Sequence, residues 1–269
     1  MYNCSAFFME FVLYILAGAG VGLAIGMTGV GGGSLMTPIL SGLFGFPLNV
    51  AVGTDLLYAA ITKTSGVVAH HRKRNINWRL VVLLAIGSVP ASVCTAFLLK
   101  NFFTDADAYE PILTSALGVM LILTSLVLIF RKKIQATHAT GLGQNQRPLK
   151  HAGAITLAAG VFLGVFVTLS SVGAGAFCAA LLLVLYPRLS AIQVIGTDIA
   201  HAVPLTLIAG LGHVLLLGNI NWELLAGLLI GSIPAIHAGT YFASRLPNGI
   251  MHPILASILL VMGCRFAFF

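Results

Sequence analysis

The sequence predicts an all-α polytopic membrane protein that is built from two copies of one multi-helix unit. The 269 residues are 58% hydrophobic and only 8% charged, whereas about a quarter of the residues in soluble domains are charged. The apolar residues form long segments that lack the alternation of barrel strands, and lipid offers the backbone no hydrogen-bond partner, so these segments must be helices. The segments and four short motifs recur in the same order in both halves.

Five apolar segments in the first half, residues 1–130, are followed by five of similar lengths in the second half, residues 151–269. They cover residues 7–27, 34–46, 48–69, 78–99 and 108–130, and then 151–170, 176–186, 190–217, 222–243 and 250–266. The second segment of each half reaches only about 16 to 20 Å as a helix, too short for a membrane core of about 30 Å. Each half is therefore predicted as a glycine-broken short or re-entrant helix followed by three spanning helices, which gives eight to ten membrane segments.

The duplication is visible in residues as well as in hydropathy. The matched motifs are Val30-Gly31-Gly32-Gly33 with Val172-Gly173-Ala174-Gly175, Gly53-Thr54-Asp55 with Gly196-Thr197-Asp198, Asn75-Ile76-Asn77-Trp78 with Asn219-Ile220-Asn221-Trp222, and Gly87-Ser88-Val89-Pro90-Ala91 with Gly231-Ser232-Ile233-Pro234-Ala235. Their offsets drift only from 142 to 144 positions. Four collinear matches indicate an internal repeat.

Charge predicts that the two copies have opposite orientations in the membrane. The net charge is +7, and most basic residues lie in residues 70–79 and in a polar linker, residues 131–150, rather than on a nucleic-acid surface. The counterpart of the first block, residues 217–221, carries no charge. Because basic loops stay in the cytoplasm, we expect the linker to be cytoplasmic, both termini to be non-cytoplasmic, and the copies to form an inverted repeat.

The glycine-rich breaks before the short segments are the first candidate site. Glycine lets the backbone leave helical geometry, and the helix that follows offers unpaired N–H groups and a positive dipole end, which suit an anion. The predicted substrate-binding residues there are Thr28, Gly29, Gly31, Gly32, Gly33 and Ser34, with Ser170, Ser171, Gly173 and Gly175 in the second half. Close helix packing through small residues is the structural alternative.

The second candidate site contains the repeated Thr-Asp pairs, which are Thr54-Asp55 and Thr197-Asp198. A carboxylate inside a membrane costs at least about 2.5 kcal/mol, so it needs a partner or a task. Lys63 and His201 lie one or two helical turns further along. We expect Thr54, Asp55, Thr197, Asp198 and His201 to act in coupling to protons or sodium or in gating, and Lys63 to attract the anion. The alternatives are that the carboxylates only hold the bundle together and that Lys63 extends to the cytoplasmic surface.

Cofactor and metal chemistry finds no support in the cysteines and histidines. Cys4, Cys94, Cys178 and Cys264 have no metal-binding or redox spacing and are interpreted as packing residues. No span contains an HxxxH or HExxH pattern. Without a nucleophile and base arrangement or a metal set, we expect no enzyme activity and no cofactor.

The break Gly26-Met27-Thr28-Gly29-Val30-Gly31-Gly32-Gly33-Ser34, the Gly-Thr-Asp motif of the second half and Gly218-Asn219-Ile220-Asn221-Trp222 resemble the TauE/SafE family, also called the toluene sulfonate uptake permease family. The similarity covers nearly the whole chain. It implies a transporter of the bacterial or archaeal inner (plasma) membrane that exports or imports sulfite, sulfonates or related sulfur-containing anions.

Together, the residues and the resemblance predict a secondary transporter that moves a small sulfur-containing oxyanion by alternating access. Its partners are then the small-molecule anion and the lipid bilayer. A passive anion channel is the main alternative function, and a membrane-embedded enzyme is a more distant one.

Overall fold

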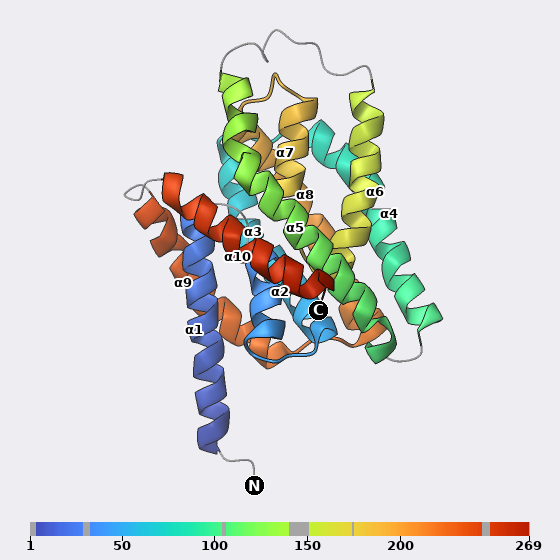
Figure 1. Ribbon diagram of the computed structural model, residues 1–269, viewed down its shortest axis with the longest axis vertical. Helices are drawn as coiled ribbons and strands as arrows, with labels where there is room; N and C mark the ends of the chain where they lie inside the picture. The colour runs from blue at the N-terminus through green and yellow to red at the C-terminus, as the bar shows by residue number, and fades with distance from the viewer. Residues whose placement is uncertain are drawn as a thin grey trace.

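The computed structural model describes residues 4–28, 33–103, 106–139, 151–173, 175–243 and 248–268, and side chains within 8–27, 34–103, 108–130, 151–173, 175–242 and 253–268. These residues form an all-helical bundle (Figure 1). Its helices are α1 (Cys4–Thr28), α2 (Gly33–Gly42), α3 (Leu48–Arg72), α4 (Trp78–Phe102), α5 (Ala106–Ala139), α6 (Ala152–Ser170), α7 (Ala176–Leu185), α8 (Ala191–Gly212) with the π-helical extension η1 (His213–Leu217), α9 (Trp222–Ala243) and α10 (Asn248–Phe268). The predicted all-α, multi-pass fold class is confirmed, and each predicted segment corresponds to one helix, with η1 continuing α8.

Some helix ends differ from the predicted ones. Helix α2 ends at Gly42 rather than at residue 46. Helix α5 continues through residues 131–139, which the sequence assigned to the polar linker. The rest of that linker, residues 140–150, lies outside the described residues. Helices α2 and α7 have 10 residues each, as the short second segments predicted.

The described helices carry the length and composition of a multi-pass membrane protein. Six spans are long and apolar enough to cross a bilayer: Phe8–Met27, Trp78–Phe102, Ala108–Phe130, Ala152–Ser170, Ala191–Leu217 and Trp222–Phe242. Helix α3 is long enough but is too polar to be identified in this way, because it contains Asp55, Lys63 and a basic last turn. Large apolar side chains such as Leu16 and Phe97 point outward, where lipid tails would cover them.

The packing of the helices follows the sequence duplication. Helix α1 packs along α9 at one flank, and the equivalent pair, α6 and α4, packs at the opposite flank (Figure 1). Helices α3 and α8, which are equivalent to each other, contact in the middle, and so do α5 and α10. Equivalent helices of the two halves therefore make equivalent contacts with each other, as in an isologous two-fold interface.

Small residues bring the flanking helices together at equivalent positions. A Cβ atom added to Gly18 or Gly22 in α1 would overlap the backbone of Leu228 or Ser232 in α9. A Cβ atom added to Gly160 or Gly164 in α6 would likewise overlap the backbone of Leu84 or Ser88 in α4. These four contacts are related by the offsets of the sequence repeat. They are close helix approaches of the small-residue type that is common in membranes.

The Asn-Ile-Asn-Trp motifs begin α4 and α9. Asn77 Oδ1 accepts a hydrogen bond from the Leu80 N–H (3.4 Å), and Asn221 Oδ1 accepts one from Leu224 (2.9 Å), so both asparagines are N-caps. The backbone N–H of each cap donates to a threonine of the other half: Asn77 to Thr197 Oγ1 (2.9 Å) and Asn221 to Thr54 Oγ1 (3.3 Å). Two repeated motifs thus meet across the halves.

These contacts make α3 and α8 antiparallel. Gly53, early in α3, faces Asn219, which follows the end of α8 and η1, and Gly196, early in α8, faces Asn75, which follows the end of α3. Equivalent helices that run in opposite directions are the arrangement that an inverted repeat requires. The orientation of this pair relative to a membrane stays a prediction.

The second half has one residue more than the first half just before its turn, and η1 accommodates this residue. Arg74 (φ 55°) and Gly218 (φ 69°) are equivalent left-handed residues at these turns. The Asn75 N–H donates to the His70 carbonyl, whereas the Asn219 N–H reaches one residue further back, to His213. A π-helical turn accommodates one inserted residue without breaking a helix. This insertion explains why the repeat offset changes from 143 to 144.

Candidate functional site

Asp55 is the centre of a buried polar cluster within the first half. It lies on α3 with no exposed surface, and the Thr37 hydroxyl of α2 donates to its Oδ2 (2.6 Å). Its Oδ1 has no hydrogen-bond partner. An ionised carboxylate can accept several hydrogen bonds, so Asp55 retains unused capacity in an apolar environment.

The break between α6 and α7 reaches this carboxylate from the second half. Ser171, the C-cap of α6, has a left-handed backbone (φ 58°) and is 3% exposed. Its hydroxyl lies beside the Asp55 carboxylate and interacts with it, but forms no hydrogen bond of ordinary geometry. We refer to Thr37, Asp55 and Ser171 as the Asp55 centre. It joins α2, α3 and α6, and hence both halves.

Other residues of the same break maintain its shape. The Ser170 hydroxyl donates to the Phe166 carbonyl (2.6 Å) and accepts from the Val172 N–H (3.2 Å). Gly173 has φ +114°, where a side chain is disfavoured. The Ala179 N–H donates to the Gly175 carbonyl, so the amides just before Ala179 belong to the first turn of α7. The first-turn N–H groups of a helix have no acceptor within the helix.

Asp198 forms the equivalent centre in the second half. It lies on α8 and is 5% exposed, and its Oδ1 has no hydrogen-bond partner. The fully buried Cys178 thiol of α7 lies against its carboxylate. The short helix of each half therefore places one side chain against the carboxylate of the following helix: Thr37 on Asp55, and Cys178 on Asp198.

Lys63 connects the two carboxylates electrostatically. It lies on α3, two turns beyond Asp55, and its side chain is half-buried. Its ammonium interacts with Asp198 more strongly than with Asp55. The antiparallel α3 and α8 place Asp55 and Asp198 toward opposite ends of the pair, with Lys63 between them.

A second pair of equivalent contacts involves the serines of the Gly-Ser-x-Pro-Ala motifs. Ser88 Oγ of α4 lies 2.8 Å from His201 Nε2 of α8. At the equivalent position, the Tyr58 hydroxyl of α3 lies beside Ser232 of α9. His201 Nδ1 has no hydrogen-bond partner and is fully buried. Each contact joins the two halves. In each, the residue on α3 or α8 lies one helical turn from the carboxylate of that helix.

The structure places the predicted site residues in three groups. Asp55 lies beside Ser171, Asp198 interacts electrostatically with Lys63, and His201 lies one turn beyond Asp198. Thr54 and Thr197 contact the asparagine caps rather than the carboxylates. Gly29, Gly31 and Gly32 lie outside the described residues, as does the Thr28 side chain. Gly33 begins α2, and Ser34, in its first turn, is 8% exposed.

Sequence reasoning missed the side chains that complete the polar centres, namely Thr37, Tyr58, Ser88, Cys178 and Ser232. Ser88 and Ser232 occupy the same place in a repeated motif, and this signal could have found them. Tyr58 and His201 occupy equivalent positions with different residues. Thr37 and Cys178 have no matching residue in the other half, so the repeat gave no indication of them.

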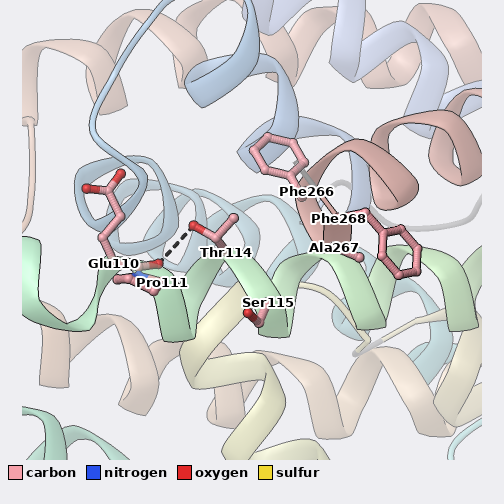
Figure 2. A pocket seen from close by; sticks show the side chains of 7 residues that line it. All are labelled: Glu110, Pro111, Thr114, Ser115, Phe266, Ala267 and Phe268. Carbon is pink, nitrogen blue, oxygen red and sulfur yellow. Dashed lines mark hydrogen bonds between the residues drawn. The ribbon is translucent and has the colours of Figure 1, made fainter.

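A hollow of about 420 Å³ lies elsewhere on the protein, between the start of α5 and the end of α10 (Figure 2). Its lining includes Glu110, Thr114 and Phe266, and the Thr114 hydroxyl donates to the Glu110 carbonyl (2.8 Å). It contains none of the buried polar groups described above. We therefore do not assign it to the candidate site.

Known proteins give a consistent identification. A family model described as "Sulfite exporter TauE/SafE" matches residues 14–266. "Probable membrane transporter protein YjnA" of Bacillus subtilis is 39% identical over 94% of this chain and 98% of the relative. "Probable membrane transporter protein YdhB" of the same organism is 27% identical over 93% of this chain and 100% of the relative.

A relative from an archaeon extends this comparison. "Probable membrane transporter protein MJ0441" of Methanocaldococcus jannaschii is 28% identical over 96% of this chain and 95% of the relative. No solved structure matches the chain. The family match across nearly the whole chain, together with these full-length relatives, shows that the chain is a membrane transporter that belongs to the TauE/SafE family.

Proposed function

We propose that this protein is a secondary transporter that moves a small sulfur-containing oxyanion, such as sulfite or an organosulfonate, by alternating access. The observation that supports this most is the pair of buried carboxylate centres at the contact between two reciprocally packed halves. The short helices α2 and α7 adjoin these centres. Broken helices near the middle of a membrane are typical of the binding sites of repeat-built transporters.

The anion is proposed to bind at the N-termini of α2 and α7. First-turn amides without internal acceptors and the positive dipole ends favour an oxyanion there. The proposed ligands are Thr28, Gly29, Gly31, Gly32, Gly33 and Ser34 on one side and Ser170, Ser171, Gly173 and Gly175 on the other, with Lys63 adding positive charge. Within this set, Ser170 acts by holding the break in shape.

The substrate class rests on the family. The family description names a sulfite exporter, and sulfite has the size and charge that helix N-termini accommodate. Asp55, Asp198 and His201 are proposed to couple transport to a cation. Thr54 and Thr197, next to the carboxylates in sequence, each accept a hydrogen bond from the asparagine cap of the opposite half and so hold the turn of that half in place.

We further propose that the halves form an inverted repeat in the inner membrane, with a cytoplasmic linker and non-cytoplasmic termini. The antiparallel α3 and α8 support this arrangement. In such a design, the two halves exchange conformations between the outward and inward states. Equivalent contacts, such as Gly22 with Ser232 and Gly164 with Ser88, give both states a similar packing.

Sulfite flux into proteoliposomes tests this function. We expect saturable uptake and, for Ser34→Ala, an apparent KM at least about tenfold higher, because a hydrogen bond to a charged group contributes about 1.5 to 3 kcal/mol. Ser257→Ala, on the exposed face of α10, is the control and should transport normally. Flux that does not saturate would indicate a channel, and an unchanged KM in Ser34→Ala would contradict the proposed site.

A further inference from the structure

We propose that Thr37, Asp55 and Ser171 form a binding site for one sodium ion. This inference deepens the proposed function by naming the coupling cation and its ligands. Only the coupling role of the ion rests on that function, because binding of sodium can be measured without any anion.

The ligand atoms are oxygens that the fold leaves available. Asp55 Oδ1 and Ser171 Oγ are buried and have no hydrogen-bond partner. Thr37 donates its proton to Asp55 Oδ2, which leaves the lone pairs of its own oxygen unused. A carboxylate with two hydroxyls is an oxygen-only set, which suits a hard cation rather than a soft metal.

Two of these oxygens are neighbours that one ion could share. The Ser171 hydroxyl interacts with the Asp55 carboxylate, yet neither Ser171 Oγ nor Asp55 Oδ1 completes a hydrogen bond of ordinary geometry. A hard cation bound between them would satisfy both oxygens at once.

Charge balance favours one added cation at Asp55. The groups that face the two centres carry two carboxylates, Asp55 and Asp198, and one ammonium, Lys63. Because Lys63 interacts more strongly with Asp198, Asp55 is the less compensated carboxylate. Desolvated charge is costly unless it is paired, and a single sodium ion at Asp55 neutralises the set.

The backbone around the site has the matching polarity. Ser171 caps the carboxyl end of α6, where the helix dipole is negative and favours a cation. Thr37 and Asp55 belong to the first half and Ser171 to the second. Sodium bound there contacts both halves, and its binding is linked to their relative position. This gives the ion a direct means of driving alternating access.

Thermal unfolding of the purified protein without sulfite tests the site. Replacing choline chloride with sodium chloride at constant ionic strength should raise the Tm by about 3 °C once sodium exceeds its Kd about tenfold. Potassium should have little effect. Asp55→Asn should abolish the shift, and Ser257→Ala, on the exposed face of α10, should retain it.

A second variant tests the site independently in case Asp55→Asn does not fold. Ser171→Ala removes one ligand and should raise the Kd for radioactive sodium about tenfold. Equal shifts in sodium and choline, or a shift that survives Asp55→Asn, would overturn the site. A stabilisation that follows pH and ignores sodium would overturn it in favour of a proton. If sulfite flux fails but sodium binds at Asp55, the proposed function falls and this site stands.

Discussion

Replacement of Lys63 by methionine is expected to lower the free energy of unfolding by about 3 kcal/mol and to abolish transport. Removing one partner of a buried charge pair costs about 3 to 5 kcal/mol, and the half-buried position of Lys63 places it at the lower end. The variant leaves Asp55 and Asp198 without their shared ammonium. Denaturation of the purified protein and sulfite flux measure the two effects.

The double variant Lys63→Met with Asp198→Asn separates charge balance from packing. Because Asp198 is the stronger partner of Lys63, neutralising it should restore most of the lost stability, but not transport. Neutralising a carboxylate that did not interact with Lys63 would give no such recovery. A double variant that is no more stable than Lys63→Met would contradict the electrostatic link between the two halves.

Alanine at Gly53 or at Gly196 is expected to destabilise the protein by about 3 kcal/mol each. A Cβ atom at these glycines would overlap the backbone carbonyl of Asn219 or of Asn75, and no side-chain rotamer can relieve a clash with backbone. Overpacking of this kind costs about 1 to 3 kcal/mol or more. The yield of monodisperse protein and its Tm report the loss.

Gly66→Ala is the matched control on the same helix as Gly53. Its added Cβ would lie 3.4 Å from Ile199 Cγ2, an ordinary van der Waals contact. Its Tm should equal or exceed that of the unaltered protein, because alanine favours helix over glycine. If Gly196→Ala behaved like Gly66→Ala, the close contact between the repeated Gly-Thr-Asp and Asn-Ile-Asn-Trp motifs would be wrong.

The helices could be predicted because their information is local. Lipid requires internal hydrogen bonds along each apolar segment, so hydropathy located the segments, including the short α2 and α7. Helix ends depend on weaker signals: the polar residues 131–139 were assigned to the linker, yet they continue α5. The one-residue insertion at η1 was visible only as a change of offset.

The functional site was less predictable because it depends on contacts between distant segments. Asp55, Asp198 and Lys63 were identifiable, since charge inside an apolar segment is rare. Their partners, such as Thr37 and Ser88, are common small polar residues that gain meaning only from what they touch. Thr54 and Thr197, expected to act with the carboxylates, bond to the asparagine caps of the opposite half, and no local pattern indicates such a contact.

Cysteine labelling in intact cells tests the opposite orientation of the halves most directly. Arg74 and Gly218 are equivalent exposed positions in the turns that follow α3 and η1. Single cysteines at these positions would be introduced into a variant without Cys4, Cys94 and Cys264. A membrane-impermeant maleimide should label Gly218→Cys in intact cells and Arg74→Cys only after the membrane is opened. Labelling of both from the same side would contradict the inverted arrangement and the binding site proposed between the halves.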